Sequence, residues 1–475
     1  MDQQPATNYS SSISRLFIGL IAITCITSIA LALQTRYNAH PDEAVHLDAF
    51  CYFEQHWWPP ALNSNGLLYS PDGWSRVYNG EVVYFLYGKL GTLIRSFGNR
   101  VGHLHIEFVK QTIDYQGNLL YLPLILTLKT DQCVSALHIY RLLNSFLLLL
   151  TLSLLFLVGR QHRLATWIGM LMLCTPQVIY IYSYANSDAW GLSSAVFLFL
   201  FALTQRNLLT SYPKLLALGG LTGLLLLSKE PFWISLLFSY SIIFWHGLED
   251  YDRRVWVHGR LQSLKAIALV ALIAVVLIAP WRIIYPLTQP GYSVAVEQMR
   301  EARARADFKP STPTNPGYRL ASKGVSFTRL LTDRKWMDQS AQSFYGVFGY
   351  FMVLLPLWVY QLALAILGLN LFLTVRTLLQ RRRIWVTADK VLYASAIVSM
   401  AVCVFASVYN SWTYDNQPQG RYLFSSIFPL GLLLCGPIDV ESQQVRVVRM
   451  IGWMVLYGVS LYVLWHFGIL NPVLK

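Results

Sequence analysis

The run LFIGLIAITCITSIALAL, residues 16–33, decides the class of protein to which this chain belongs. It contains no charged residue, and about 20 apolar residues in a helix suffice to cross the hydrocarbon core of a bilayer. Arg15 precedes the run and no clear small-residue cleavage site follows it, so we interpret it as a retained span rather than a signal peptide. Similar runs recur along the whole sequence, which predicts a helical membrane protein.

The composition supports this interpretation. Of the 475 residues, 55% are hydrophobic and only 13% are charged, whereas soluble domains average about 25% charged residues. The formal net charge of +13 would suggest a nucleic-acid partner for a soluble protein. Here the basic residues cluster in short loops between apolar runs, as signals of membrane orientation do, so we expect no nucleic-acid partner.

Apolar length predicts an all-α polytopic bundle of about eleven transmembrane helices in a single domain, residues 1–475. Two of the runs are short and are separated by Pro231, which cannot continue a helix, so we expect a broken or re-entrant pair there. The expected spans are residues 16–33, 134–158, 164–182, 189–204, 213–228, 231–246, 265–285, 347–375, 391–409, 423–437 and 450–468.

The short loops predict the orientation of the bundle. Basic residues gather in every second short loop, and the positive-inside rule places those loops in the cytoplasm. The N-terminus is then cytoplasmic, and the C-terminus lies outside with two long loops, residues 34–133 and 286–346. Within the first long loop, Ala44–His56 and Val82–Phe97 each have the pattern of an amphipathic helix that lies on the membrane surface.

Two of the six cysteines, Cys51 and Cys133, fall in the first external loop. A disulfide between them is possible in an oxidising compartment, and the sequence leaves this pairing open. The other cysteines lie within expected spans, where we interpret them as small apolar residues. The spacing of the cysteines and histidines gives no metal motif.

The most informative polar stretch is HPDEAVHLD, residues 40–48, directly after the first span. Pro41 suits the first position of a helix, and acids in the first turn complement the helix dipole. Asp42 and His46 then lie one turn apart on one face, with Glu43 beside them. The stretch is either a capped interfacial helix start or a carboxylate held at the membrane surface to accept a proton from a hydroxyl.

Three cations are expected at the same outer surface, each with a structural alternative. Arg141 and Arg421, near the outer ends of two spans, are either snorkelling interfacial residues or ligands of a phosphate. Lys229 either pairs locally with Glu230 or joins them at the phosphate. The residues expected to line the acceptor side of the cavity are polar residues from three external segments: His46, Asp48, Asn186, Asp188, Tyr414 and Asp415.

The acidic motif HPDEAVHLDAF, residues 40–50, opens the first external loop and resembles the GT-C superfamily of integral-membrane glycosyltransferases. That superfamily includes the protein O-mannosyltransferases and the aminoarabinose transferase of lipid A. Three other segments resemble an uncharacterised bacterial branch, the DUF2142 type. They are YANSDAWGL (residues 184–192), SFYGVFGYFMVLLP (residues 343–356) and QGRYLFSSIFPL (residues 419–430).

The resemblance implies a GT-C fold and an inverting glycosyltransferase that uses a sugar linked to polyprenyl phosphate. It maps the general base onto Asp42, with Glu43 as its neighbour and the less favoured base. It maps phosphate-binding cations onto Arg141 and Arg421. The implied setting is the bacterial inner membrane, with the active site on the periplasmic or extracellular side and an envelope glycan, lipid or protein as acceptor.

Some relatives use a divalent ion, but Asp42 and Asp48 do not share a helix face, so we expect no metal and no other cofactor. Two other functions stay open. A transporter of lipid-linked glycan or another polar solute would bury charges near the midplane on broken helices, which only the Lys229-Glu230 pair suggests here. A non-catalytic partner in envelope assembly would keep the fold without the activity.

Overall fold

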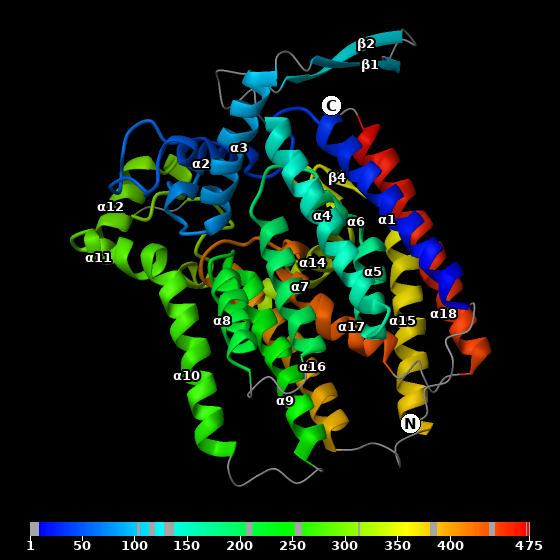
Figure 1. Cartoon of the computed structure of the whole chain (residues 1–475). Helices are drawn as coiled ribbons and strands as arrows, with labels where there is room; N and C mark the ends of the chain where they lie inside the picture. The colour runs from blue at the N-terminus through cyan, green and yellow to red at the C-terminus, as the bar shows by residue number, and fades with distance from the viewer. Residues whose placement is uncertain are drawn as a thin grey trace.

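The computed structural model describes residues 9–101, 105–113, 119–127, 137–205, 211–251, 259–311, 314–380, 387–436, 442–471 and 473–474. Helices make up nearly all of the regular structure in these ranges, and the long ones stand side by side in a bundle (Figure 1). The predicted all-α class is therefore confirmed.

Six helices in the described ranges are long and apolar enough to cross a membrane. The protein is thus a multi-pass membrane protein. The other expected spans coincide with helices shorter than these six, so the predicted total of about eleven crossings stays a prediction. The six are α1 (Tyr9–Gln34), α4 (Leu137–Gly159), α10 (Gly259–Ile278) with its continuation to Thr288, α15 (Leu357–Gln380), α16 (Thr387–Thr413) and α18 (Gln443–Val463) with its continuation to Ile469.

The shorter helices complete the bundle between these spans. The predicted break at Pro231 is confirmed, because a 3-10 turn, η4 (Glu230–Ile234), separates α8 (Tyr212–Leu226) from α9 (Ser235–Tyr251). The remaining bundle elements are α5 (Arg163–Leu173), α6 (Pro176–Ile181), α7 (Asp188–Thr204), α8 (Tyr212–Leu226), α9 (Ser235–Tyr251), η8 (Gly420–Ser426) and α17 (Ile427–Cys435).

Two expected spans are wrong in outline. Residues 164–182 form two helices rather than one, because Pro176 begins α6 and has no N–H with which to continue α5. The span expected over 347–375 begins only at Leu357. The residues before it form a small hairpin of β3 (Val347–Phe348) and β4 (Val353–Leu354), which turns at the left-handed residue Phe351.

Most of the structure outside the spans gathers at one end of the bundle, which we call the loop end (Figure 1). Helices α9 and α15 end, and α10, α16 and α18 begin, at the opposite end. This grouping agrees with the predicted alternation of loops. The loop-end elements include α2 (Glu43–Gln55), η1 (Arg76–Tyr78), α3 (Val82–Val101), the paired strands β1 (His105–Ile113) and β2 (Leu119–Thr127), α12 (Tyr292–Arg303), α13 (Phe327–Thr332) and α14 (Trp336–Tyr345).

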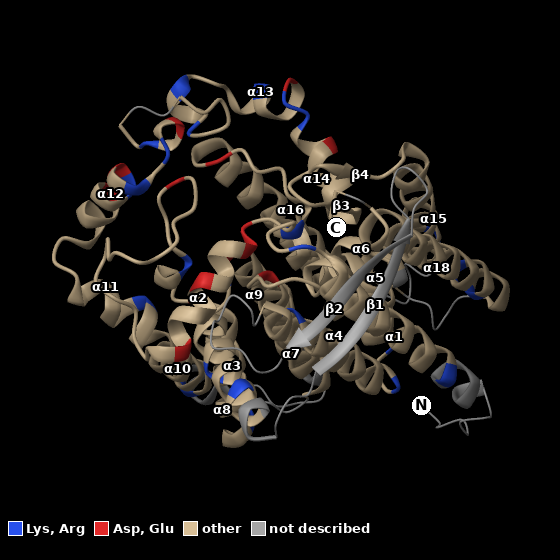
Figure 2. Ribbon diagram, turned by 90° about the horizontal axis from the view of Figure 1, so that it is seen from above, with Lys and Arg blue, Asp and Glu red and all other residues tan. Residues whose placement is uncertain are grey.

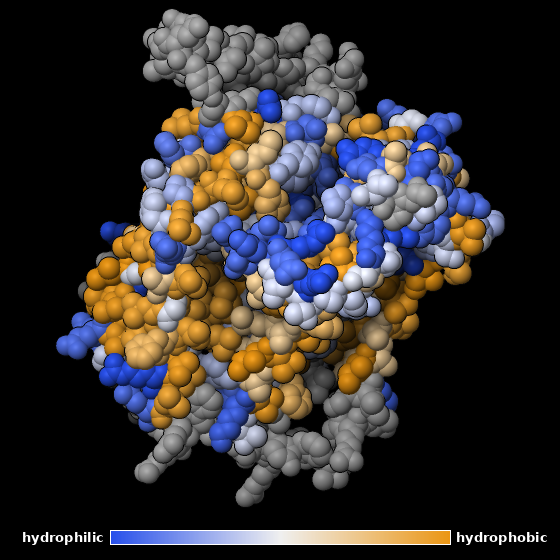
Figure 3. Space-filling model, turned by 180° about the vertical axis from the view of Figure 1, so that it is seen from behind, coloured by the Kyte–Doolittle hydropathy of each residue, from blue (hydrophilic) through white to orange (hydrophobic). Residues whose placement is uncertain are grey.

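The surface follows the same division. Seen from behind, hydrophilic side chains cover much of the upper part of the molecule, and hydrophobic side chains form a band below them (Figure 3). Exposed large apolar residues on the long helices, such as Leu272, Phe372 and Phe405, are what a bilayer requires of its contact surface.

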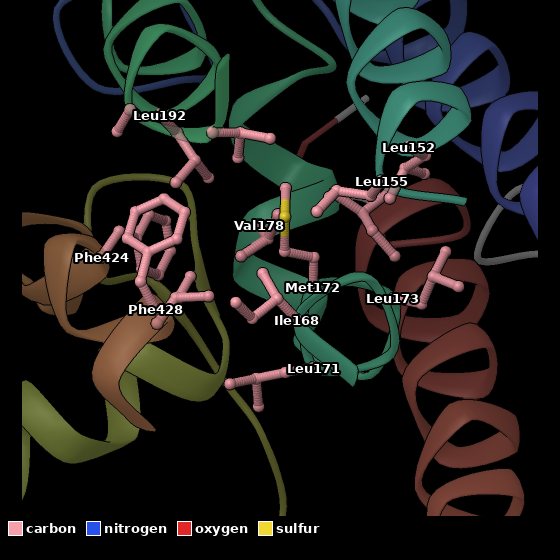
Figure 4. Close-up of a cluster of buried hydrophobic side chains, with 14 of the residues drawn as sticks. Leu152, Leu155, Ile168, Leu171, Met172, Leu173, Val178, Leu192, Phe424 and Phe428 are labelled. Atoms are coloured by element: carbon pink, nitrogen blue, oxygen red, sulfur yellow. The ribbon is translucent and has the colours of Figure 1, made fainter. Parts of the chain in front are cut away.

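A continuous apolar core holds the bundle together and anchors the segments that carry the polar site. Side chains of α4, α5, α6 and α7 meet those of η8 and α17, as Figure 4 shows for Leu155, Ile168, Val178, Leu192 and Phe424. All five are at most 1% exposed. The start of α7 at Asp188 and the part of η8 that carries Arg421 are therefore fixed by packing, which matters because both are site residues.

The two long loops pack against each other. Arg303 of α12 donates from Nε to Asn63 Oδ1 at 2.6 Å and from Nη2 to Asn65 Oδ1 at 2.7 Å. Gly73 adopts φ +76°, and a Cβ there would lie 2.8 Å from the backbone nitrogen of Ala304. Glycine is needed at this crossing, where residues 286–346 fold onto the first loop.

Cys51 is disulfide-bonded. The predicted partner, Cys133, lies outside the described residues, so the pairing stays a prediction. Cys25, Cys174 and Cys403 are buried, as expected for cysteines that fill space within spans.

Candidate active site

The chain turns from α1 into α2 at Asp42, which precedes the helix in a left-handed conformation with φ +58°. The main-chain carbonyl of Asp42 accepts a hydrogen bond from His46 N at 3.0 Å, but its side chain makes no capping bond. Asp is one of the few residues that tolerates this conformation. The carboxylate therefore projects away from the helix that it precedes and is available for other contacts.

Asp42 forms an ion pair with Arg76 of the turn η1. Arg76 Nη2 donates to Asp42 Oδ2 at 3.0 Å, and the side chains are 20% and 30% exposed, respectively. Burial alone would raise the pKa of Asp42, but the positive charges of Arg76, Arg421 and Lys229 outweigh it and lower the pKa below its usual range. Asp42 is thus an ionised carboxylate that solvent, and hence a substrate, can still reach.

A second ion group lies at the start of α7. Asp188 is fully buried, and Lys229 Nζ donates to its Oδ1 at 2.8 Å while Arg421 Nη1 lies 3.2 Å from its Oδ2. The two cations are 12% and 4% exposed. Two cations share one carboxylate, which leaves a formal charge of +1 on this group. Such a charge in a dry environment favours an anionic ligand.

These two ion groups act on each other, since the charges of Lys229 and Arg421 contribute to the low pKa of Asp42. We call the five residues together the charged cluster: Asp42, Arg76, Asp188, Lys229 and Arg421. Seen from above, both acidic and basic residues mark the region between α2 and α16 (Figure 2). Among the described residues, the Nε atoms of Arg76 and Arg421 are buried without a hydrogen-bond partner, so the cluster has unused donors.

Glu43, the neighbour of Asp42, is used differently. It is fully buried and accepts two hydrogen bonds from Arg141, from Nε at 2.8 Å and from Nη2 at 2.7 Å. It also accepts the backbone N–H of Ala185 at 3.2 Å and that of Asn38 at 3.1 Å. The four hydrogen bonds occupy both carboxylate oxygens, so Glu43 serves as a tie between α2, α4 and the turn before α7.

Arg141 has equally little freedom. It is fully buried, and besides Glu43 it donates to the carbonyls of Ala32, Thr35 and Arg36 at 3.0, 2.6 and 3.0 Å. These carbonyls belong to the end of α1, where helix carbonyls have no partner within the helix. This structure therefore does not present Arg141 to a phosphate, in contrast to the prediction, because its donors close the end of α1.

The predicted local pair of Lys229 with Glu230 is wrong. Lys229 turns to Asp188, and Glu230, whose side chain is 70% exposed, lies 3.7 Å from Arg282 Nη1 instead. The sharp turn before Pro231 separates the two side chains, because Lys229 is extended while Glu230 begins the 3-10 turn.

Three of the residues predicted to line the acceptor side contact different partners in the structure. His46 is buried, and its Nδ1 is 2.8 Å from the hydroxyl of Tyr84. Burial, reinforced by nearby cations, holds the pKa of His46 well below its usual value, so it is neutral. Asp48 lies on another face of α2 and accepts the N–H of Leu68 at 3.0 Å. Asn186 is buried and caps the first turn of α7 by accepting Ala189 N at 3.0 Å.

The last two predicted residues lie at the turn after α16. Tyr414 donates its hydroxyl to Asp72 Oδ2 at 2.6 Å. Asp415 accepts from Gln417 Nε2 at 2.5 Å, and its pKa is raised, first by burial and then by the charges of Asp72 and Asp42. Asp415 is therefore close enough to the charged cluster for the charge of Asp42 to affect its pKa. The pKa of Asp415 is raised, whereas that of Asp42 is lowered.

Two features of the site could not be found in the sequence. Arg76 lies 34 positions after Asp42 in a loop, and the only signal is a single basic residue between Trp74 and Tyr78. Tyr184 orients Arg421 by accepting a hydrogen bond from its Nη1 at 2.9 Å, and it stacks on the buried ring of His40 with a centroid distance of 4.6 Å.

The arrangement of the possible metal ligands also bears on whether the site could hold an ion. Within the part of the chain that the structure describes, no group of three or more His, Cys, Asp or Glu side chains is arranged to hold an ion. Asp42, His46 and Asp48 turn to Arg76, Tyr84 and Leu68, respectively. The expectation of a metal-free site stays a prediction.

Fold and site define a polytopic α-helical membrane protein with a charged cluster between its loop end and its bundle. The family described as Predicted membrane protein (DUF2142) matches residues 98–430, and the chain belongs to this family. The resemblance of the motifs after α6, at the β3–β4 hairpin and at η8 to this family is thereby confirmed. None of the curated proteins matches the sequence.

Among solved structures, the chain is similar to ArnT from Cupriavidus metallidurans bound to undecaprenyl phosphate, with a TM-score of 0.47 and 12% sequence identity over 94% of this chain. The apo state of the same protein gives a TM-score of 0.45 and 14% identity over 93% of this chain. In both cases the match covers 63% of the ArnT chain, so this chain spans less than two thirds of its length.

Proposed function

We propose that the protein is a membrane glycosyltransferase of the GT-C type that moves a sugar from a polyprenyl-phosphate donor to a hydroxyl acceptor with inversion. The observation that carries the proposal is the charged cluster. It combines an ionised, reachable carboxylate, Asp42, with cations that exceed the charge of their own carboxylate, Asp188. Sugar transfer from a phosphate needs both a proton acceptor and positive charge for the leaving group.

In the proposed step, the acceptor hydroxyl oxygen forms a bond to the anomeric carbon of the donor sugar. The bond from that carbon to the phosphate oxygen breaks, and its electron pair stays on the phosphate. The hydroxyl proton passes to Asp42, whose low pKa keeps the carboxylate ionised and ready to accept it. Lys229 and Arg421 stabilise the negative charge that grows on the leaving phosphate, and the unused Nε of Arg421 is one donor for it.

Glu43 and Arg141 have a positioning role in this proposal. Their buried bidentate pair ties the end of α1 to the first residue of α2, and Asp42 lies between these two elements. We propose that the protein lies in a bacterial inner membrane with the loop end outside. We propose an envelope glycan, lipid or protein as the acceptor. The positive-inside pattern of the short loops supports the orientation in this proposal.

A transporter is the second candidate, and one observation favours it. The buried group of Asp188, Lys229 and Arg421 adjoins the helix break at η4, and buried charges at broken helices are typical of transport sites. Against it, Asp42 and Arg76 belong to the loop end and are partly exposed, which suits chemistry at a surface.

The two candidates are separated with the full-length protein in nanodiscs and in liposomes. Wild type is incubated with a panel of radiolabelled polyprenyl-phosphate sugars and total envelope lipid, and product is separated by chromatography. In parallel, liposomes are assayed for movement of the same labelled lipids across the bilayer. The proposal expects covalent transfer of label to a new product and no protein-dependent movement. Movement without a new covalent product would favour the transporter.

A further inference from the structure

One face of α2 borders a separate cavity of about 260 Å³. Helix periodicity places Asp48, Tyr52 and Gln55 on this face, while Glu43 and Phe50 point into the protein. His56, the residue that ends the helix, also lines the cavity. We call this cavity the α2 pocket. It lies next to the proposed site but is not part of it.

The charge of the α2 pocket differs from that of the charged cluster. Glu54, on its wall, forms an ion pair with Arg95 and accepts the hydroxyl of Tyr140, so its charge is compensated. Asp48 accepts a backbone N–H from Leu68, and no cation pairs with it among the residues that the structure describes. The lining therefore carries a formal charge of −1, which repels phosphates and other anions.

The pocket also offers aromatic surface beside this carboxylate. The rings of Tyr52 and His56 stack with their centroids 4.2 Å apart and an angle of 19° between their planes. The Tyr52 hydroxyl donates to the carbonyl of Trp58 at 3.1 Å, which holds the pair in place. A carboxylate, an amide from Gln55 and an apolar ring face in one small cavity match a ligand with both hydroxyls and C–H faces, because the few polar groups fix its orientation.

The distance along the helix allows both sites to be filled together. Asp48 follows Glu43, the first residue of α2, by five positions, which corresponds to about 7.5 Å along the helix axis. A sugar in the α2 pocket would therefore not compete for space with a donor sugar beside Asp42, and a chain of two or three linked sugars could reach from one site to the other.

We infer that the α2 pocket binds an uncharged, hydroxyl-rich sugar unit of the acceptor and thereby determines which acceptor reaches Asp42. The inference rests on the proposed function for the identity of the ligand as acceptor. The predicted contacts are hydrogen bonds from sugar hydroxyls to the Asp48 carboxylate and the Gln55 amide, with a C–H face on the Tyr52 and His56 rings.

Direct binding tests this inference without any turnover. Full-length protein in nanodiscs is titrated calorimetrically with methyl glycosides of glucose, galactose, mannose and N-acetylglucosamine, and with glucuronic acid as an anionic counterpart. Wild type is expected to bind at least one neutral glycoside and to bind the acid at least tenfold more weakly. Asp48→Asn is expected to weaken neutral binding by about tenfold or more, because hydrogen bonds to a charged group contribute about 1.5–3 kcal/mol.

Asp42→Asn is the matched control, since it alters the charged cluster and leaves the α2 pocket intact. It is expected to bind the glycosides as wild type does. Binding that is lost in Asp42→Asn but kept in Asp48→Asn would overturn the inference, as would the absence of neutral glycoside binding to wild type. Sugar binding with these properties but no transfer from any donor would instead contradict the proposed function and leave the α2 pocket as a sugar site.

Discussion

Asp42 and Glu43 are neighbours in the sequence, yet the fold gives them opposite environments. Glu43 is fully buried, and both of its oxygens are occupied by Arg141 and by backbone N–H groups. Asp42 keeps 30% of its side chain exposed, and Arg76, with which it forms an ion pair, is itself partly exposed. Burial and hydrogen-bond partners, rather than position in the sequence, distinguish a carboxylate that is fully occupied by structural contacts from one that a substrate can reach.

The difference arises from one backbone torsion. The left-handed conformation of Asp42 turns its side chain away from the first turn of α2, whereas Glu43 has helical geometry and points inward. Tyr350 supports this conformation by accepting the N–H of Asp42 at 3.2 Å and donating to Asn38 Oδ1 at 3.1 Å. Substitutions can test this difference between the two acids, and their expected effects decrease in the order given below.

The largest effect is expected for stability when the Glu43–Arg141 pair is broken. Glu43→Leu leaves the Arg141 guanidinium buried without its carboxylate, and loss of one partner of a buried pair costs about 3–5 kcal/mol. Thermal unfolding of the detergent-solubilised protein should show a much lower Tm and a lower folded yield. Asp307→Asn, which breaks an exposed pair with Arg305, is the control and should leave the Tm unchanged. A stable Glu43→Leu protein would contradict the structural role of this acid.

The next largest effect is expected on kcat when a cation of the charged cluster is removed. Lys229→Met or Arg421→Met removes a cation that we propose to stabilise the leaving phosphate, and loss of one such donor lowers kcat by about 10²–10³-fold. Initial rates of sugar transfer with saturating acceptor measure this. Arg319→Gln, which removes a partly exposed cation paired with Glu297 outside the charged cluster, should transfer at the wild-type rate. Equal rates for the cluster variants and this control would separate the cations from the chemistry.

Removal of Arg76 should change the pH dependence of transfer. Among the charges that lower the pKa of Asp42, that of Arg76 has the largest effect, while burial acts to raise the pKa. In Arg76→Gln the pKa of Asp42 therefore rises, and Asp42 becomes protonated at a higher pH than in wild type. The acid limb of the pH profile of kcat should move to higher pH, by up to about one to three pH units for loss of a close Arg. An unchanged or lower acid limb would show that Asp42 does not govern it.

The smallest effect is expected for the group that supports the backbone of Asp42. Tyr350→Phe removes one hydrogen bond to Asp42 N and one to Asn38, and each such bond contributes about 0.5–1.5 kcal/mol. Transfer should fall about two- to tenfold with an unchanged Tm, since Tyr350 is itself exposed. A loss as large as that expected for the cluster cations would assign Tyr350 a direct part in the reaction.

The sequence was sufficient to predict the all-α membrane class, the helix after residue 42, the break at Pro231 and the grouping of the long loops at one end of the bundle, because these depend on local apolar length, proline and charge. It also predicted that four charged residues lie in one region, and the structure places them in one cluster: Asp42, Asp188, Lys229 and Arg421.

The partners of these residues could not be predicted. Glu43 and Arg141 are 98 positions apart and Arg421 and Tyr184 are 237 apart, and only tertiary packing decides that they meet. Arg141 and Arg421 have equivalent positions near the ends of spans, so the sequence could not show that one closes the end of α1 while the other faces the cluster. The split at Pro176, by contrast, follows from the same physical rule as the break at Pro231.

The most direct test of the central claim compares sugar transfer by Asp42→Asn and Glu43→Gln at equal concentrations of folded protein. Each substitution removes a negative charge and keeps the size of the side chain. Asp42→Asn should fold with a wild-type Tm and lose about 10²–10⁴-fold in kcat, the contribution of a general base. Glu43→Gln should lower the Tm and the folded yield. The turnover of each folded molecule should fall less than in Asp42→Asn and by no more than about 10²-fold, the loss that a misplacement of about 1 Å can cause. The reverse pattern, with an active Asp42→Asn and an inactive but stable Glu43→Gln, would contradict the assignment of Asp42 as the reacting acid.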